Sequence, residues 1–345
     1  MSAHAVTVVR INEIQAHPNA DALELVPVWG YTCAIRKGSF QVGDLAAYVE
    51  PDYEVNLGLP EFAFLQKPGK FRANHRIAVT RLRGVYSQGL LIPAPQGAQE
   101  GDNVMEHFGI TRWEPPEPSL VKGAYAEKGP EVFAPKYDLE NWRKYWKLLG
   151  EQEQIILTPK IHGTNARFVF MDGRMWCGSR TQWKMPPGMP LENEAEVDGL
   201  TKCSPQSAWW TALEQNPWIR TWCSNNPGTI LYGEVYGPNI QQGFHYGLKS
   251  GQMGFVVFDI LRKGHWVPNS DFSREEFQGL NFVPTLYTGA NNAEVIRSLA
   301  EENESFNGAG HIREGVVVKL VTERHDPEIG RLALKHVSNR YFEVK

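Results

Sequence analysis

Hydrophobic and polar positions alternate in short runs over the first third of the chain. Gly, Pro, Asn and Asp separate these runs, a pattern typical of β-strands joined by turns. The runs predict strands at residues 5–11, 23–28, 46–49 and 76–82. Short strands of this kind predict a small β-barrel over residues 1–112.

A proline-rich stretch with little periodicity follows at residues 113–136. Its prolines are Pro115, Pro116, Pro118, Pro130 and Pro135. Such a composition favours a stiff linker or a strap between two domains.

The pattern changes again after residue 137. Apolar residues at helical spacing predict a helix over 139–149, with Asp138 as its cap, and further helices over 207–214 and 293–302. Between the helices, apolar runs predict strands at 155–158, 166–171, 229–235, 254–261, 315–321 and 332–335. We therefore expect an α+β domain with a largely antiparallel sheet at 137–345. The tryptophans Trp209, Trp210, Trp218 and Trp222 are expected to pack in its core.

Composition fits this two-domain organisation. A chain of 345 residues corresponds to about two domains. With 42% hydrophobic and 21% charged residues, neither global disorder nor a coiled coil is expected. The chain has 35 Lys and Arg against 39 Asp and Glu, a net charge of −4. Bulk charge therefore argues against a protein that coats nucleic acid, and any site for a polyanion must be local.

One local basic segment exists in the first domain. Residues 62–99 contain no Asp or Glu. The cations of this segment are Lys67, Lys70, Arg72, Arg76, Arg81 and Arg83. Two interpretations remain open: a solvated basic face, or a track for a phosphate backbone with Phe71 and Tyr86 as stacking groups.

Location and redox state follow from what the sequence lacks. We expect a cytoplasmic protein with no membrane association, because there is no leader-like apolar segment and no run of 18 apolar residues. Cys33, Cys177, Cys203 and Cys223 are far apart and form no C-x-x-C pair. Reduced core thiols are therefore expected, rather than a zinc site or disulfides.

The most informative feature is an ordered set of six short segments. They are K-I-H-G-T-N at 160–165, S-R-T at 179–181, L-Y-G-E-V-Y-G at 231–237, F-V-V-F-D-I at 255–260, R-E-G-V-V-V-K at 313–319 and L-A-L-K at 332–335. This set resembles motifs I, Ia, III, IIIa, IV and V of the covalent nucleotidyltransferases, which include polynucleotide ligases and RNA capping enzymes. The K-x-H-G-x-N form is similar to the RNA-ligase branch.

The resemblance implies that Lys160 is the catalytic nucleophile. Attack on the α-phosphorus of ATP needs a neutral amine, and an ordinary lysine pKa makes that form unfavourable by roughly 4 to 5 kcal/mol at pH 7. Positive charge from Lys319, Lys335 and a divalent cation would lower the pKa of Lys160. Glu234 and Glu314 are the expected ligands of that cation, Mg²⁺ or Mn²⁺.

The resemblance also implies a set of nucleotide-binding residues. They are Ile161, His162, Gly163, Asn165, Arg180, Glu234, Phe258, Lys319 and Lys335. Arg180 suits a phosphate or 3′-hydroxyl, Asn165 a ribose or phosphate, and Phe258 the adenine ring. Gly163 would allow the backbone to approach the nucleotide. For His162, a structural hydrogen bond and a contact to metal-bound water are both open.

Each of these residues would have an ordinary structural explanation if it stood alone, so the joint occurrence carries the prediction. One position departs from the family pattern. Related RNA ligases often carry two motif V lysines as K-x-K, whereas Ala333 occupies the first position here. Lys335 must therefore act with Lys319 or with Arg331.

Two further segments carry a looser resemblance. H-P-N-A-D-A-L at 17–23 and L-R-G-V-Y-S-Q-G-L at 82–90 look like parts of OB-fold tRNA-binding modules. Together, the two halves resemble RNA ligases of the Deinococcus and Naegleria type. This implies an OB-fold β-barrel at 1–112, a linker at 113–136 and, at 137–345, an adenylyltransferase (ATP-grasp-like ligase) domain with antiparallel sheets and flanking helices.

The expected function is an ATP-dependent RNA ligase that joins 3′-hydroxyl and 5′-phosphate RNA ends through lysyl-AMP, in RNA repair and as a monomer. A DNA ligase or capping enzyme is less expected, because only ten residues follow Lys335 and the resemblance would then require a C-terminal OB domain. The other alternative is a non-catalytic RNA-binding protein with a vestigial nucleotidyltransferase fold.

Overall fold

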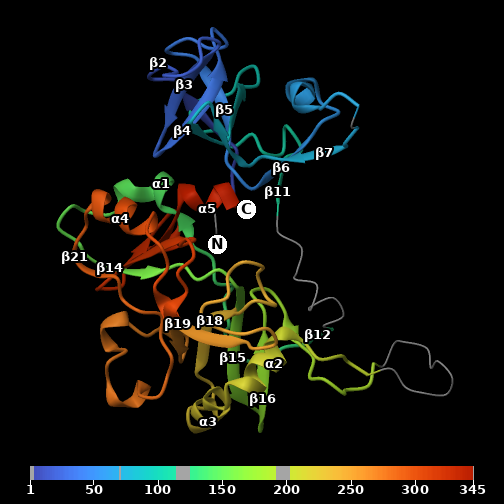
Figure 1. The fold of residues 1–345 in the computed structure, drawn as a ribbon, viewed down its shortest axis with the longest axis vertical. Helices are drawn as coiled ribbons and strands as arrows, with labels where there is room; N and C mark the ends of the chain where they lie inside the picture. The colour runs from blue at the N-terminus through green and yellow to red at the C-terminus, as the bar shows by residue number, and fades with distance from the viewer. Residues whose placement is uncertain (1–3, 70, 114–124, 192–202, 345) are drawn as a thin grey trace, which may run out of the picture. The chain divides into compact units, whose positions relative to one another are not determined.

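The computed structural model describes residues 4–69, 71–113, 125–191 and 203–344. Its contacts divide the chain into two compact units. The first comprises Met1–Pro116, Glu140–Leu149 and Phe342–Lys345, and the second Glu117–Leu139 and Gly150–Tyr341. The expected domain limits stay a prediction. Each unit is mostly β-sheet with a few short helices, so the chain is of the α+β class (Figure 1).

The first unit is built from short antiparallel strands in four small sheets. The strands are β1 (Thr7–Arg10), β2 (Gln15–Ala16), β3 (Leu23–Val28), β4 (Tyr31–Arg36), β5 (Leu45–Val49), β6 (Tyr53–Asn56), β7 (Asn74–Arg76), β8 (Val79–Leu82), β9 (Val85–Gln88), β10 (Leu90–Pro93) and β11 (Thr111–Arg112). The sheet orders are β1-β5-β10, β2-β3-β4, β11-β6-β7 and β8-β9. A 3₁₀ helix, η1 (Pro60–Leu65), lies between β6 and β7.

Strand β5 explains why the first unit has two hydrophobic clusters. Successive side chains of a strand point to opposite faces. Ala47 and Val49 accordingly belong to one cluster, and Ala46 and Tyr48 to the other. The continuous apolar run of this segment is therefore a strand buried on both faces.

Two sequence expectations in the first unit are wrong. The strand expected at 76–82 is broken after Arg76, because Ile77 pairs its backbone with Tyr53 and Asp52 while β8 pairs with β9. The helix expected over 139–149 is also shorter. Residues Glu140–Asn141 are extended as β13, the Asn141 side chain rather than Asp138 caps α1 (Trp142–Tyr145), and a 3₁₀ helix, η3 (Trp146–Leu148), follows.

The second unit contains two antiparallel sheets. The larger has the order β12-β17-β16-β15-β18-β19-β20, and the other contains β25-β22-β14-β21. The strands are β12 (Ala126–Glu127), β14 (Gln154–Pro159), β15 (Thr164–Met171), β16 (Arg174–Gly178), β17 (Trp183–Lys184), β18 (Ile230–Tyr236), β19 (Gly254–Arg262), β20 (His265–Trp266), β21 (Tyr287–Ala290), β22 (Gly315–Leu320) and β25 (Ala333–Val337). The pair β23 (His325–Asp326) and β24 (Gly330–Arg331) lies between β22 and β25 in the chain.

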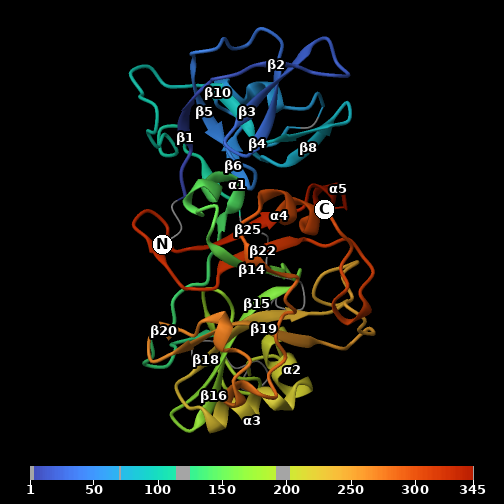
Figure 2. The ribbon, with the colours of Figure 1, turned by 90° about the vertical axis from the view of Figure 1, so that its left-hand side faces the viewer.

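Helices cover these sheets on separate sides (Figures 1 and 2). α2 (Ala208–Gln215) and α3 (Pro217–Asn225) pack against the larger sheet, and α4 (Ala293–Ala300) packs against β22 and β25. The last helix is α5 (Asn339–Val344), and short 3₁₀ turns follow β20 and α4: η4 (Asn269–Asp271), η5 (Glu275–Phe277) and η6 (Phe306–Gly308).

The core of the second unit is rich in tryptophan. Trp209, Trp210 and Trp222 are buried in it, and Trp218 packs against it, which confirms the expected packing role. The cysteine expectation holds for Cys33, Cys177 and Cys223, which are buried free thiols, and is wrong for the fourth, Cys203, which is exposed. Among the described residues, no helix is long and apolar enough to cross a bilayer.

We predict that the anchor of η1 is a single aromatic side chain. Phe62 is fully buried and meets Phe108 edge-on at 6.1 Å between ring centroids. Phe62→Ala should lower the free energy of unfolding by about 3–5 kcal/mol, because it leaves a cavity in the core. Phe64→Ala is the matched control, since Phe64 is exposed. It should change the unfolding free energy by less than about 0.5 kcal/mol in the same denaturant titration, and equal losses would contradict this assignment.

Candidate active site

The candidate nucleophile lies where two motif segments run side by side. Lys160 directly follows β14, and its backbone N–H donates to the carbonyl of Gly315 at 2.9 Å. This pairing continues the β14–β22 ladder, in which Pro159 faces Val316. The ammonium of Lys160 donates to Glu314 Oε1 at 2.8 Å, and the Lys160 side chain is 26% exposed. The sheet register thus brings residues 154 positions apart into direct contact.

A second carboxylate shares the field of Lys160. Burial raises the pKa of Glu234 to about 8. The positive charge of Lys160 opposes this shift, and the negative charge of Glu314 adds to it. Burial acts on Glu314 as well, but the direct contact with Lys160, followed by His162, lowers its pKa to about 2. The two glutamates therefore differ in protonation. Glu314 is the anion at neutral pH, whereas Glu234 mostly keeps its proton, and its ionisation would add a negative charge that a single lysine does not compensate.

The protein alone keeps Lys160 protonated. Burial lowers the pKa of the ammonium, but the carboxylates of Glu314 and Glu234 outweigh burial and hold the pKa above its ordinary value. The expectation that Lys319 and Lys335 lower this pKa is therefore wrong for the protein's own charges. A neutral Lys160 requires positive charge beyond what its side-chain neighbours supply.

His162 and Gly163, two and three positions after Lys160, are tightly held. The His162 ring lies edge-on to Phe244 and Tyr341, with centroid distances of 4.5 and 5.1 Å, and Tyr341 Oη is 3.2 Å from its Nε2. The ring Nδ1 is 3.5 Å from Glu314 Oε2. A Cβ on Gly163 would lie 2.2 Å from the carbonyl oxygen of residue 235. Gly163 is thus needed for close packing against β18, whereas the sequence suggested an approach to the nucleotide.

The remaining predicted residues near the nucleophile come from the larger sheet and its flanks. Asn165 faces Glu234 across the β15–β18 pair, and the amide oxygen of Asn165 is buried without a hydrogen bond. Arg180 lies close enough to act electrostatically on Lys160, and its guanidinium donates to Asp138 at 3.0 Å. Ile161 is buried.

A second buried cluster centres on Asp259, which has no exposed surface. Its carboxylate accepts two hydrogen bonds from Arg331, at 2.9 and 3.0 Å, one from Lys319 at 2.8 Å and a short one from Tyr137. Lys319 also donates to the carbonyl of Phe258 at 2.5 Å. Burial would raise the pKa of Asp259, but Arg331 and then Lys319 lower it to about 2. Asp259 is therefore a fixed anion between two cations.

This cluster determines the surroundings of the candidate adenine platform. The Phe258 ring lies 4.5 Å from that of Tyr137, and the same tyrosine bonds Asp259. Arg331 additionally pairs with Glu323 at 2.5 Å. Motif V has Ala333 where related ligases often have a lysine. Arg331, two positions before Ala333, binds the Asp259 carboxylate together with Lys319.

Strand register places the motif V lysine on the same face as Lys319. In the β22–β25 pair, Lys335 faces Val317 and Lys319 faces Ala333. Alternate residues of a strand share a face, so Lys319 and Lys335 both lie on the face that includes Val317.

Several of these site residues could not be named from the sequence. Asp259 lies inside the quoted F-V-V-F-D-I segment, so a signal existed, but its charge partners are 60 and 72 residues away. Tyr137 and Asp138 lie next to the proline-rich stretch with no motif to mark them. Tyr341 follows the last motif.

The donor set around Lys160 suits a hard divalent cation. Glu314 Oε2 and Asn165 Oδ1 are buried oxygen atoms without hydrogen-bond partners. Mg²⁺ and Mn²⁺ favour carboxylate and amide oxygens, and a cation would compensate the second carboxylate, Glu234. The described residues contain no group of three or more His, Cys, Asp or Glu side chains arranged for a metal. Substrate oxygens and water would therefore have to complete the coordination.

The predicted RNA-binding cations differ in their surroundings. Arg76 is paired with Asp52 and stacks over Trp113 at 3.5 Å, and Arg81 pairs with Glu343 at 2.5 Å. Lys67, Arg72 and Arg83 are exposed, and Lys70 lies outside the described residues. All six cations stay predicted RNA contacts, although Arg76 and Arg81 each already have a carboxylate partner.

The two segments that resemble OB-fold modules meet in the structure. The carbonyl of Leu82 is 3.1 Å from His17 Nε2, and that of Arg83 accepts a hydrogen bond from Asn19 at 2.9 Å. This contact fixes the β8–β9 turn, where Arg83 has a φ of 47°. His17 and Asn19, which lie outside the β8–β9 hairpin, therefore hold its turn in place.

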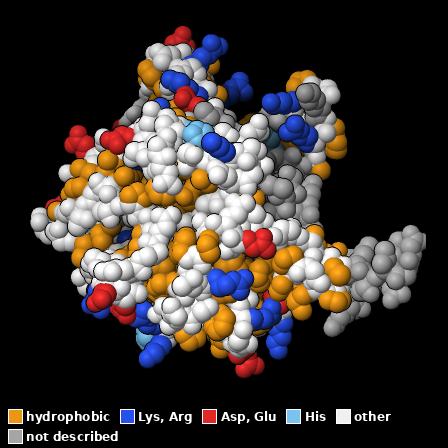
Figure 3. All heavy atoms as spheres, turned by 60° about the horizontal axis from the view of Figure 1, so that its bottom comes forward, with side chains coloured by type: hydrophobic (Ala, Val, Ile, Leu, Met, Phe, Trp, Pro, Cys, Tyr) orange, Lys and Arg blue, Asp and Glu red, His pale blue; other side chains and the backbone are white. Residues whose placement is uncertain are grey.

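Charge is mixed elsewhere on the molecule. On the face shown in Figure 3, basic and acidic side chains of the described residues are interspersed, which agrees with a net charge of −4. A surface of this kind provides no broad field for a polyanion.

The short-stranded first unit and the motif lysine bonded to Glu314, with Glu234 nearby, point to a ligase of the nucleotidyltransferase type. A model of the RNA ligase family matches residues 153–337, and an OB-fold domain model matches residues 5–94. The chain belongs to the RNA ligase family and is an enzyme of that family. This confirms the resemblance found in its sequence.

Solved structures of one protein resemble the whole chain. A mutant of the Naegleria gruberi RNA ligase with AMP and Mn matches with a TM-score of 0.78 and 26% identity, covering 99% of both chains. Another mutant with ATP and Mn has a TM-score of 0.76 and 26% identity over 98% of both chains. The same ligase with PPi also has 0.76 and 26%, over 99% of both chains. No curated protein sequence matched the chain.

We predict that Asp259 is essential for stability. Asp259→Asn should lower the free energy of unfolding by about 3–5 kcal/mol, because Lys319 and Arg331 would remain buried without their anion. The loss should be equal at pH 5 and pH 8, since the pKa of Asp259 is about 2. Glu328→Gln, a change at an exposed carboxylate, is the control in the same denaturant titrations. A loss that grows between pH 5 and pH 8 would contradict the assignment.

We predict that Glu234 makes folding depend on pH. Its pKa is raised to about 8 by burial, above the value in the unfolded chain. The folded state then keeps a proton that the unfolded state releases, so stability falls as pH rises through about 4.5 to 8 and levels off above. Glu234→Gln should remove this slope in urea titrations without added metal. Parallel curves for mutant and wild type would disprove the shift.

Proposed function

We propose that the protein is an ATP-dependent RNA ligase that joins 3′-hydroxyl and 5′-phosphate RNA ends through a lysyl-AMP intermediate, in RNA repair. The observation that carries this proposal is the contact between Lys160 and Glu314, next to a second, half-buried glutamate, Glu234, whose pKa burial raises to about 8. The similarity to an RNA ligase whose structures contain ATP or AMP with Mn supports it.

The proposed chemistry has three steps. The amine of Lys160 attacks the α-phosphorus of ATP, so that an N–P bond forms and pyrophosphate leaves. AMP then passes to the 5′-phosphate of an RNA. A 3′-hydroxyl finally attacks that phosphate, and AMP is released as the strand is sealed. Alignment of the hydroxyl with the activated phosphate is the main requirement of the last step.

The chain's own residues hold and orient the nucleophile. Glu314 fixes the position of the Lys160 ammonium, and the aromatic contacts of His162 fix the turn that follows it. Glu234 and Glu314, with Asn165 beside Glu234, would hold a divalent cation. When bound, that cation would supply positive charge that favours the neutral amine and stabilises the phosphates.

The nucleotide contacts are assigned by position. Phe258, backed by Tyr137, would stack on adenine, and Lys335 shares the face on which Lys319 lies. Lys319 is already bonded to Asp259, so we propose that it shapes the base site through the carbonyl of Phe258. Arg180 would contact a phosphate or a ribose hydroxyl.

Two alternatives are less well supported. A non-catalytic RNA-binding protein would have no need of the partly buried Lys160–Glu314 pair, which costs desolvation. A DNA ligase or capping enzyme does not fit the family match or the order of the two matched regions, with the OB-fold region first.

The decisive experiment follows the label from α-labelled ATP. Wild type should form a covalent adenylate with Mg²⁺ or Mn²⁺, and the label should leave when 5′-phosphate RNA is added. Lys160→Ala should abolish the adenylate, and Lys160→Arg should do no better, because a guanidinium does not deprotonate near neutral pH. Lys147→Ala, at a surface position outside the motifs, is the control. Retained adenylate in either Lys160 mutant would place the nucleophile elsewhere.

A further inference from the structure

The segment around η1 combines a buried anchor with an exposed aromatic end. Phe62 is fully buried, whereas Phe64 is 65% and Phe71 90% exposed. Burying a phenylalanine contributes roughly 1.5–3 kcal/mol. Two rings left in water on one short segment therefore provide apolar surface for a ligand, in contrast to the ring beside them that completes the core.

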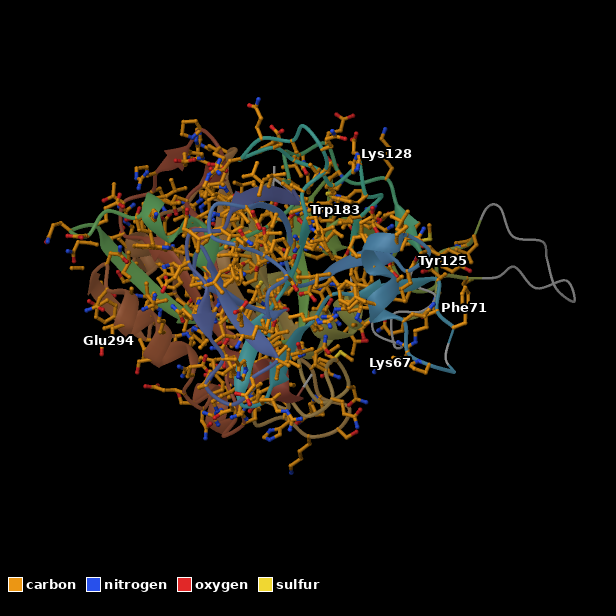
Figure 4. The ribbon with its side chains drawn as sticks, turned by 90° about the horizontal axis from the view of Figure 1, so that it is seen from above. Lys67, Phe71, Tyr125, Lys128, Trp183 and Glu294 are labelled. Carbon is orange, nitrogen blue, oxygen red and sulfur yellow. The ribbon has the colours of Figure 1, made fainter. Side chains whose placement is uncertain are left out.

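The end of this segment is closed by a side chain. Gln66 accepts a hydrogen bond from the backbone N–H of Arg72 at 3.3 Å and donates to the carbonyl of Arg72 at 3.1 Å. This pair of bonds joins the two ends of the turn that carries Lys67 and Phe71. Figure 4 shows both side chains at the outer end of the segment.

The charge that follows Glu61 of η1 along this segment is all positive. Residues 62–99 include no Asp or Glu, and Lys67 and Arg72 are exposed. Burial, followed by the charges of Arg72 and Lys67, lowers the pKa of His75. Both cations therefore lie close enough to act on the His75 ring. In the described part of the chain, neither Lys67 nor Arg72 forms an ion pair, whereas Arg76 and Arg81 are paired with carboxylates.

We propose that Phe64, Lys67, Phe71 and Arg72, here called the aromatic tip, bind unpaired RNA, with a base stacked on Phe71 and the backbone phosphates at Lys67 and Arg72. Exposed aromatic rings among cations are the usual means of binding single strands, since each base offers a face for stacking. A base inside a perfect duplex has no free face. The tip would therefore favour an unpaired end or flank over a continuous helix.

This inference rests on the proposed function, since it assigns part of the RNA substrate of the same enzyme. The two are tested separately. Failure of wild type to form an adenylate on Lys160 would overturn the ligase proposal. The binding assay below uses no ATP and reports on the tip alone.

The test compares two RNA probes on the full chain. One is a fluorescein-labelled oligouridylate with hydroxyl groups at both ends, which cannot be sealed, and the other is a perfect RNA duplex of the same length. Fluorescence anisotropy gives the affinity at several KCl concentrations. Phe71→Ala should weaken binding of the single strand about tenfold and binding of the duplex less than twofold.

Matched variants separate stacking from charge and from folding. Phe71→Trp should restore single-strand binding, because it keeps a stacking face. Lys67→Ala should lower the slope of log affinity against log salt by about 0.7 per lost phosphate contact, whereas Phe71→Ala should leave that slope unchanged. Val42→Ala removes another exposed apolar side chain, 64% exposed, and should change neither.

Three results would overturn the proposal. Wild-type affinity of Phe71→Ala for the oligouridylate would do so, as would equal losses on both probes. A change of oligomeric state in Phe71→Ala by light scattering, with RNA binding intact, would show that the tip is a protein interface. A thermal unfolding curve accompanies each variant, and the exposed ring should leave the midpoint unchanged.

Discussion

The site depends on two carboxyl groups that share one lysine. Two carboxylates, Glu234 and Glu314, act on the ammonium of Lys160. These carboxyl groups hold the Lys160 side chain in place as an ammonium, which is stable but cannot attack phosphorus. Under the proposed function, the carboxyl groups that hold the lysine would also attract a cation that enters with ATP. The same pair would then position the amine and bind the metal that makes it neutral.

The cluster at Asp259 shows the opposite balance. Its two carboxylates, Asp259 and Glu323, face two cations, Lys319 and Arg331, so that nothing is left to compensate. The two clusters use the same residue types within one domain. The charges of the Asp259 cluster cancel, whereas ionisation of Glu234 would leave a negative charge that Lys160 does not balance. The Asp259 cluster also holds the backbone of Phe258, through the hydrogen bond that Lys319 donates to its carbonyl.

The sequence predicts those parts of the fold that depend on local pattern. Strands β14, β15, β18, β19, β22 and β25 follow from apolar runs, because side-chain alternation and burial act within each segment. The break after Arg76 and the short helix α1 depend on distant backbone partners and an Asn141 cap, which a local pattern does not contain. Aromatic residues at helical spacing are equally compatible with a short helix followed by a 3₁₀ turn.

For the candidate site too, the sequence predicts one part, the identity of the residues, and not the other, their protonation. Lys160, Glu234 and Glu314 were predictable because an ordered set of motifs constrains residues that composition alone would leave on separate surfaces. Their protonation was not, since it depends on how β14 and β22 align and on which charges that alignment leaves nearby. The role of Lys319 shows the limit. A lysine in a motif indicates a positive charge, but only the folded structure shows that Lys319 bonds to Asp259.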